Sequence, residues 1–304
     1  MTAEPLALGL DIGGTKVVGG VVDADGTIIS TIRRGTPAAG GNALRDVVVA
    51  VARDLGERFP VAAIGVGTAG LVDPARSTVL FATHLGWRNE PVRALLEAAC
   101  DVPVLVENDA NAAAWAEFRF GAARDATDSV IMVTVGTGVG GGFVLGGELV
   151  RGATTTAGEV GHMVAVRGGR LCGCGRNGCL DQYASGHALV RYARDGGFLD
   201  GTAVAAAARM GDPVATGAFR QVAEWLARGV ADIVQLLDPQ VVVIGGGLAE
   251  AGDVLMDPLL EVYRKESGDR GGWPQPQVRA AELGNLAGLV GAADLARRHR
   301  GSPR

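Results

Sequence analysis

Two stretches of this 304-residue chain, one in each half, follow the same order of strand, glycine-rich turn, strand, turn and strand. In the first half, an apolar strand at 6–10 leads into the turn at 11–16. In the second half, a strand at 129–135 leads into a turn at 136–142. Two similar α/β units that face each other create a cleft between them. The repeated pattern therefore predicts an α/β protein of two lobes.

Composition narrows the class of protein. Glycine contributes 48 residues, more than twice the average share of about 7%, so many backbone positions need positive φ or close approach to a neighbour. The net charge of −5 gives no reason to expect a nucleic-acid or membrane-surface partner. The sequence has no apolar run of membrane-spanning length, and its first residues lack the basic segment of a signal peptide. We expect a soluble, cytoplasmic protein.

Helices separate the predicted strands. Apolar residues recur at helical spacing over 42–58, and an alanine-rich helix is expected over 110–118. Helices are also expected over 203–209 and 218–237, and a helix at 285–299 closes the chain. No low-complexity linker divides the two halves, so the hinge is expected near 107–111.

Three glycine turns are candidates for nucleotide binding. In the first, backbone N–H groups and the side chains of Thr15 and Lys16 could contact phosphate oxygens, while Asp11 orients a metal-bound water. A plain hairpin turn is the alternative, and the matching position of the second turn favours phosphate binding. The third turn, after a buried strand, would let the backbone pass under a base or ribose. None has Walker A or GxGxxG spacing. The nucleotide-binding candidates are Asp11, Gly13, Gly14, Thr15, Lys16, Thr137, Gly138, Gly245, Gly246 and Gly247.

A cluster of polar residues follows the short strand at 104–106. Phosphoryl transfer to a hydroxyl needs positioning, charge stabilisation and a carboxylate that accepts the proton. Asp109 is the candidate base, and Asn108 would position neighbouring hydroxyls. The alternative makes Asp109 only the N-cap of the following helix.

One histidine and three cysteines have the spacing of a metal site. His162 precedes Cys172, Cys174 and Cys179, and this ligand set is typical of a closed, structural zinc site. Unrelated buried thiols are the alternative. The zinc would fix the glycine-rich insert at 152–186 and so place Glu159, His162 and Asp181, with the second ring nitrogen of His162 free for a sugar hydroxyl. His187 and His299 lie in no motif, and we interpret them as surface or structural residues.

Together these segments resemble the ROK family (repressor, open reading frame, kinase), and most closely its actinobacterial-type glucokinases. The resemblance rests on DIGGTK at 11–16, VENDANAAAWAE at 106–117, GTGVGGG at 136–142, GEVGHM at 158–163 and CGCGRNGCLDQYASG at 172–186. It implies an actin-like ATPase (ribonuclease H-like) fold with two lobes around a central cleft. The smaller lobe would span 1–112, completed by the helix at 285–304, and the larger lobe would span 113–284.

The resemblance also implies an activity and its residues. It implies an ATP-dependent hexose 6-kinase that uses Mg²⁺ and a structural Zn²⁺. Asp109 would be the catalytic base, and the zinc ligands would be His162, Cys172, Cys174 and Cys179. The sugar-binding positions would be Gly70, His84, Asn108, Asp109, Glu159, His162 and Asp181.

Two of these positions depart from the family pattern. Glucokinases of this type usually carry Glu where this chain has Asp181, and Asn where it has His84. Sites that hydrogen-bond specific hydroxyls discriminate strongly between analogues. The resemblance implies glucose or a close analogue as the substrate, and these two departures favour the alternative of a modified sugar such as kanosamine or a carbasugar.

Two other classes of protein agree less well with the sequence. A ROK-type sugar-responsive regulator carries a DNA-reading segment before the DxGGTK turn, where this chain has ten residues. A catalytically dead sensor would not be expected to keep Asp109, Asp11 and both phosphate turns. The expected partners are a sugar and ATP, with no nucleic acid, no membrane and a homo-oligomeric assembly. Whether polyphosphate replaces ATP is left open by the sequence.

Overall fold

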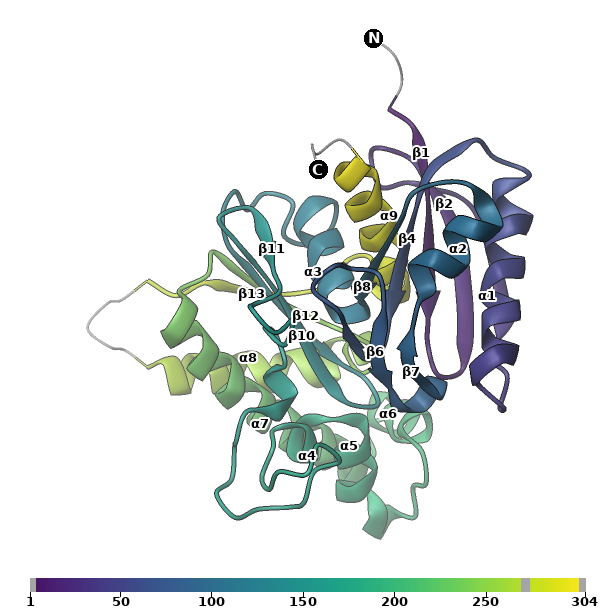
Figure 1. Cartoon of the computed structure of the whole chain (residues 1–304). Coiled ribbons are helices and arrows are strands. Elements are labelled where there is room, and N and C mark those ends of the chain that lie inside the picture. Colours follow the sequence, from purple (N-terminus) through teal and green to yellow (C-terminus); the bar gives the residue numbers. More distant parts are fainter. Residues whose placement is uncertain (1–3, 269–273, 301–304) are drawn as a thin grey trace.

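The computed structural model describes residues 4–268 and 274–300, and two five-stranded sheets form its framework (Figure 1). The first sheet has the order β3 (Ile28–Gly35), β2 (Lys16–Val22), β1 (Leu6–Ile12), β4 (Val61–Thr68), β8 (Val104–Asn108). The second has the order β11 (Glu148–Val150), β10 (Val139–Leu145), β9 (Val130–Val135), β12 (Val241–Gly245), β13 (Gln277–Ala280).

Both sheets have the same topology. In each, three strands form an antiparallel meander, and two further strands lie parallel to its first strand. The internal duplication predicted from the sequence is therefore confirmed, and so is the α/β class.

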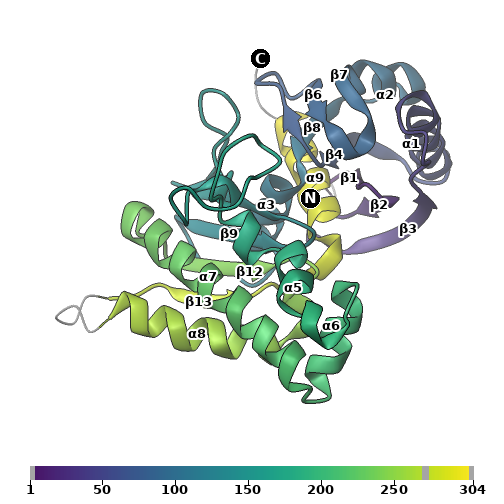
Figure 2. The same ribbon diagram turned by 90° about the horizontal axis from the view of Figure 1, so that it is seen from below.

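Helices fill the layers outside and between the sheets (Figure 2). The outer face of the first sheet packs against α1 (Gly41–Gly56) and α2 (Val92–Cys100). The outer face of the second packs against α7 (Pro213–Leu237) and α8 (Asp253–Ser267). Between the sheets lie α3 (Asp109–Arg119) and α9 (Ala287–Arg300). Within the described ranges, no helix combines the length and apolar character needed to cross a lipid bilayer.

Several predicted boundaries differ from the observed ones. The second glycine turn is shorter than 136–142, because β10 already begins at Val139 and carries Gly140 to Gly142 as strand residues. The C-terminal helix begins at Ala287, after a short 3₁₀ turn at Gly284–Leu286. The glycine-rich insert is mostly irregular, as expected, with a 3₁₀ turn η2 (Val160–His162) and the short helices α4 (Asp181–Ala184) and α5 (Gly186–Tyr192).

The sequence analysis missed a small third sheet, the edge strand β13 and four helices. The sheet contains β5 (Leu71–Val72), β6 (Val79–Ala82) and β7 (Trp87–Glu90), and the 3₁₀ turn η1 (Thr83–Leu85) connects β6 to β7. Its strands have two to four residues, too few to show a period of two. The missed helices are α2, α4, α5 and α8, and α8 has Pro258 inside it, which usually argues against a helix.

Helix α9 approaches its neighbours at backbone distance. Along β1 and β4, residues of odd number face α9, and three of them, Gly9, Gly65 and Gly67, are glycines. A Cβ on Gly9 would lie 2.1 Å from the Leu289 carbonyl oxygen, and one on Gly65 would lie 1.8 Å from that of Ala292. On the opposite side of α9, a Cβ on Gly291 would lie 1.8 Å from the Ala112 carbonyl oxygen of α3. Glycine at these positions lets α9 lie directly between the first sheet and α3.

Replacing Gly291 with alanine tests this close packing. The added methyl group would meet backbone that cannot rotate away, so Gly291→Ala should lower the free energy of unfolding by about 1–3 kcal/mol or more. Gly217 is the matched control, because it lies inside α7 and a Cβ there meets nothing within 4 Å. Gly217→Ala should raise the stability by up to about 1 kcal/mol. Urea denaturation measures both, and equal effects in the two variants would contradict the packing argument.

Candidate active site

The carboxyl ends of three parallel strands bring the first polar residues of the site together. Asp11 on β1 is in register with Gly67 on β4, which is in register with Glu107 on β8, immediately before Asn108. The first turn of α9 reaches the same place. A Cβ on Gly288 would lie 3.8 Å from Asp11 Oδ1 and 3.6 Å from the Asp109 carbonyl oxygen. Asp11 and Asp109 therefore occupy one site.

Asn108, and not Asp109, is the N-cap of α3. Its Oδ1 accepts hydrogen bonds from the amides of Ala110 at 2.9 Å and Asn111 at 3.1 Å. The alternative interpretation of Asp109 as the helix cap is therefore wrong, and the carboxylate of Asp109 begins the helix without capping it. The side-chain Nδ2 of Asn108 donates to the Gly70 carbonyl at 3.1 Å and so fixes Gly70 beside the start of α3.

Burial makes both aspartates more costly to ionise. Burial raises the pKa of Asp11 from 3.8 to about 7, with a further increase from the charge of Asp109 and an opposing effect of Lys16. Burial also raises the pKa of Asp109, although the hydrogen bond from the Ala110 amide lowers it. A carboxylate with a raised pKa is a better proton acceptor near neutral pH, which suits a general base.

Some hydrogen-bonding groups of the first glycine turn have partners within the protein. The Gly13 amide donates to the Lys16 carbonyl at 3.0 Å, and the Gly13 carbonyl accepts from Thr36 Oγ1 at 2.7 Å. The Gly13 amide is thus not free to contact a phosphate. Gly14 and Thr15 are exposed, and Lys16 is half-buried close enough to act on Asp11. The donors left for a phosphate are those of residues 14–16.

The second turn is held by Asp181. The Gly136 amide donates to the Gly138 carbonyl at 2.9 Å, and Asp181 Oδ1 accepts from the Val139 amide at 2.9 Å. A Cβ on Gly138 would lie 2.9 Å from the same carboxylate oxygen. Asp181, expected at the sugar, therefore has a partner in the turn expected at the phosphates.

The third turn contains glycines with different roles. Gly246 has φ of 86°, and a Cβ there would lie 2.6 Å from the Val135 carbonyl oxygen, so the turn packs on β9. A Cβ on Gly245 would lie 2.5 Å from Met132 Cε. Gly247 has open space around it and lines a cavity of about 600 Å³.

This cavity reaches from the second turn to the third. Its lining includes Thr137, His187, Leu199, Gly247 and Leu248. It has the size and mixed lining of a small-molecule site. His187 belongs to it, so our interpretation of that residue as only surface or structural missed a candidate.

The segment that carries Glu159 and His162 lies flush on β10. A Cβ on Gly158 would lie 2.7 Å from the Gly141 carbonyl oxygen, and one on Gly161 would lie 2.1 Å from that of Val139. Glu159 and His162 therefore flank the strand that begins at the second turn. The two ring nitrogens of His162 face different partners, since Nε2 lies 3.9 Å from Glu159 Oε2 and Nδ1 lies 3.7 Å from Cys172 Sγ.

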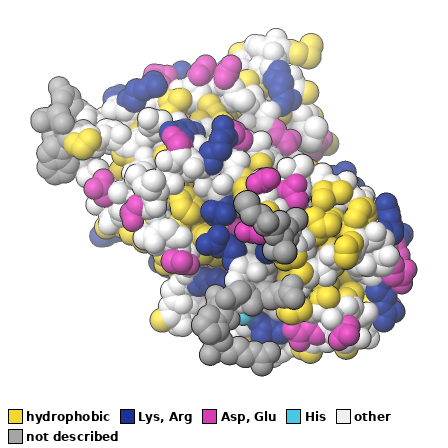
Figure 3. Space-filling view, turned by 90° about the horizontal axis from the view of Figure 1, so that it is seen from above, with side chains coloured by type: hydrophobic (Ala, Val, Ile, Leu, Met, Phe, Trp, Pro, Cys, Tyr) yellow, Lys and Arg dark blue, Asp and Glu magenta, His cyan; other side chains and the backbone are white. Residues whose placement is uncertain are grey.

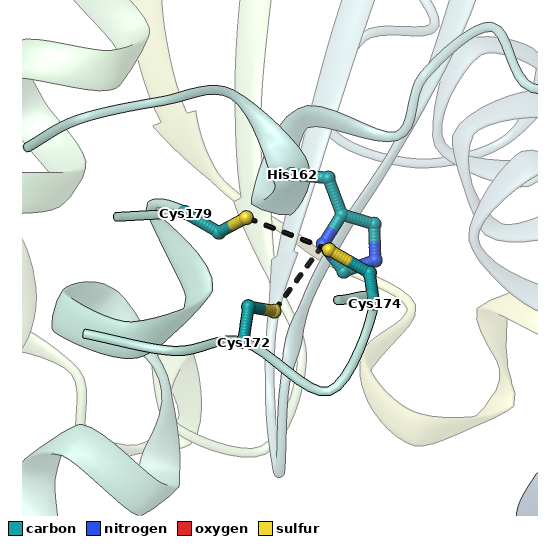
Figure 4. Close-up of side chains that lie close together, drawn as sticks. All are labelled: His162, Cys172, Cys174 and Cys179. Carbon is teal, nitrogen blue, oxygen red and sulfur yellow. Dashed lines mark hydrogen bonds between the residues drawn. The ribbon is translucent and has the colours of Figure 1, made fainter. Parts of the chain in front are cut away.

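The predicted metal ligands converge (Figure 4). The ligand atoms of His162, Cys172, Cys174 and Cys179 all lie within 4.8 Å of one another. The Sγ atoms of Cys174 and Cys179 are 3.6 Å apart, a separation suited to two thiolates on one tetrahedral ion. The donor set and its geometry fit a structural zinc.

His84 lies beside the first glycine turn, at the edge of the candidate active site. It is exposed on η1, and its Cβ lies 3.5 Å from where a Gly14 Cβ would be. Gly70, with φ of 103°, packs against the chain just before His84, where a Cβ would lie 2.3 Å from the Phe81 carbonyl oxygen. The structure thus brings His84 next to the first glycine turn and near Gly70.

Comparisons with known proteins agree with this arrangement. The ROK family model matches residues 7–299. A glucokinase of Streptomyces coelicolor is 44% identical, over 96% of this chain and 98% of that protein. An N-acetylmannosamine kinase of Escherichia fergusonii is 36% identical, over 95% of this chain and 97% of that protein. The crystal structure of a ROK family glucokinase from Streptomyces griseus, in complex with glucose and AMPPNP, has a TM-score of 0.88 at 45% identity and covers 96% of this chain and 99% of its own. The expected actin-like fold is confirmed.

Zinc content and stability should change together. We expect one zinc per chain, and Cys174→Ser should lower both the zinc content and the melting temperature, because metal binding and the order of the insert are coupled. Cys100→Ser is the control, since Cys100 lies outside the cluster. Elemental analysis and thermal denaturation test this prediction, and an ordered, active protein without zinc would contradict it.

The raised pKa of Asp11 predicts a pH-dependent cost to stability. The folded state holds a proton up to about pH 7 that the unfolded chain releases near 3.8, so stability falls as pH rises across that window. Asp11→Asn removes this cost and should raise the free energy of unfolding on the order of 2 kcal/mol at pH 8, and by less at pH 5. Urea denaturation without nucleotide or metal measures the difference. A loss of stability at pH 8 would contradict the assigned pKa direction.

Proposed function

The chain belongs to the ROK family, and from that membership we propose that it is an ATP-dependent kinase that transfers the γ-phosphate of ATP to the 6-hydroxyl of glucose. The observation that carries the proposal is the position of Asp109. It begins α3 beside Asp11 and Asn108, and the next residue, Ala110, packs on β10 just after the second turn, since a Cβ on Gly140 would lie 3.3 Å from Ala110 Cβ. A carboxylate placed between two glycine turns suits phosphoryl transfer to a hydroxyl.

Each group has a role in the transfer. Asp109 accepts the proton of the sugar hydroxyl. The oxygen of that hydroxyl bonds to the γ-phosphorus of ATP, while the bond from the γ-phosphorus to the β,γ-bridging oxygen breaks. Thr15, Lys16, Thr137 and Gly138 contact the phosphates, and the base and ribose lie in the cavity lined by Gly247 and His187. Asp11 would orient water bound to Mg²⁺, and the ion would neutralise the phosphate charge.

The sugar lies among residues of both lobes. Gly70, His84, Asn108, Glu159, His162 and Asp181 are the proposed contacts, and the zinc ligands His162, Cys172, Cys174 and Cys179 hold the Glu159–His162 segment in place. The bond from the Val139 amide to Asp181 supports glucose as the first candidate, because it gives the shortened carboxylate a role independent of the sugar. Likeness to an N-acetylmannosamine kinase keeps a modified sugar, such as kanosamine, as the second.

The organisation of the chain is part of the proposal. Residues 1–112, with the helix after 285, form the smaller lobe, and residues 113–284 form the larger lobe. The first sheet lies wholly within residues 6–108, and the second within 130–280, which supports this division. On the face shown in Figure 3, acidic side chains lie among the basic ones, which speaks against an extended nucleic-acid surface on that face. Cytoplasmic location and homo-oligomeric assembly stay predictions.

A panel of sugars tests the proposed reaction. ADP release is measured with glucose, mannose, glucosamine, kanosamine and N-acetylmannosamine, and phosphorus NMR locates the new phosphoester. We expect the highest kcat/KM with glucose and a 6-phosphate product. Turnover of kanosamine alone would favour the second candidate, and no turnover of any sugar would contradict the proposed activity.

Asp109→Asn isolates the base. The amide keeps the shape of the carboxylate but cannot accept a proton, so kcat should fall by about 10²–10⁴ while the sugar dissociation constant stays within about threefold. Steady-state kinetics and calorimetric sugar binding measure the two effects. Activity within tenfold of the unmodified protein would remove Asp109 from this role.

A further inference from the structure

A buried ion-pair network joins the segments that carry the proposed sugar contacts. We infer that Glu107 and Arg151 are positioning residues, which hold the strand-end residue Asn108, the loop after Gly70 and the segment leading to Glu159 in one fixed arrangement. This inference rests on the proposed function, since it concerns the order of the same sugar site.

Glu107 is the centre of the network. Its side chain is fully buried at the end of β8 and lies 3.2 Å from Arg76 Nε and 2.9 Å from Arg151 Nε. The same carboxylate accepts hydrogen bonds from the Asn108 amide at 2.9 Å and from Asn111 Nδ2 at 3.1 Å. Glu107 therefore holds the residues on both sides of Asp109 while it pairs with two cations from other segments.

Arg151 connects the second sheet to the third. It directly follows β11, and its guanidinium donates to the carbonyls of Asp73 at 2.9 Å and Pro74 at 3.1 Å while it pairs with Glu107. Thr155, four residues further, adds a bond from Oγ1 to the Val72 carbonyl at 2.7 Å. The chain that runs on from Arg151 to Glu159 is thus fastened to the chain that runs on from Gly70.

These contacts form a closed ring. Asn108 Nδ2 donates to the Gly70 carbonyl, the loop after Gly70 accepts from Arg151, and Arg151 pairs with Glu107, which precedes Asn108. Only a guanidinium offers the planar fork of donors that can bind a carboxylate and two carbonyls at once. A shift of any one segment therefore requires the others to move or a buried ion pair to break.

A comparison of Glu107 with Glu117 of α3 distinguishes a positioning role from a contribution to stability. Glu117 is also fully buried, but within the described part of the chain its side chain accepts hydrogen bonds from the backbone amides of Ala122, Glu282 and Leu283, away from Gly70 and Asn108. A buried ion pair is weak evidence for stability, because the cost of removing two charges from water offsets their attraction. The ring around Glu107 instead fixes the relative position of three segments.

The kinetic test compares Arg151→Lys and Glu107→Gln with Glu117→Gln as the matched control. Lysine keeps the charge of Arg151 but cannot span all its acceptors, so the sugar KM should rise about tenfold or more while the ATP KM stays within about twofold. Glu107→Gln should show the same split. Glu117→Gln should lower the melting temperature and leave both KM values within about twofold. Parallel changes in both KM values, or none in the two ring variants, would overturn the inference.

A second measurement needs no catalysis. Amide hydrogen exchange of the ligand-free protein should become faster in 70–76 and 151–162 together in Arg151→Lys and Glu107→Gln, and in neither segment in Glu117→Gln. Unchanged exchange in the ring variants would overturn the inference even in a protein that phosphorylates sugars. Coupled exchange in a protein that phosphorylates none would support the ring and contradict only the proposed function.

Discussion

The approach of α9 to the first sheet at backbone distance is the constraint on which the other contacts depend. Gly9 and Gly65 on the sheet and Gly291 on the helix leave no room for a side chain, so α9 lies in one position between the sheet and α3. Because α3 in turn packs on β10 of the second sheet, the two sheets are placed relative to each other through two helices. The first turn of α9 then closes over the ends of β1 and β8, and this fixes where Asp11 and Asp109 meet.

Burial of Asp11 and Asp109 at that point raises the pKa of both carboxyl groups, which suits proton transfer near neutral pH but lowers the stability of the folded protein. The charge of Asp109 raises the pKa of Asp11 further. In the proposed phosphoryl-transfer site, Asp109 would accept a proton and Asp11 would orient metal-bound water.

The sequence predicted those features that depend on neighbouring residues and missed those that depend on distant ones. The duplicated strand pattern, the zinc ligands and the glycine turns follow from local spacing, and the family resemblance placed Asp109. The third sheet stayed hidden because its strands are too short to show a period. Three other features depend on residues far apart in the chain, so no local pattern predicts them. They are the hydrogen bond from Val139 to Asp181, the ion pair of Glu107 with Arg151 and the cavity that His187 lines together with Gly247.

The cysteine cluster connects the two halves of the site. His162 lies three residues after Glu159, and Cys179 lies two residues before Asp181, so an ion bound by both His162 and Cys179 would set the distance between the proposed sugar segment and the second turn. Arg170, within the insert, stacks over Tyr183 of α4 at 4.8 Å and Tyr192 of α5 at 5.6 Å. The insert is therefore fastened to α5, which lines the cavity between the second and third turns. A glycine-rich segment has high conformational entropy when free, so this contact and a bound zinc would together order the segment that carries the proposed sugar contacts.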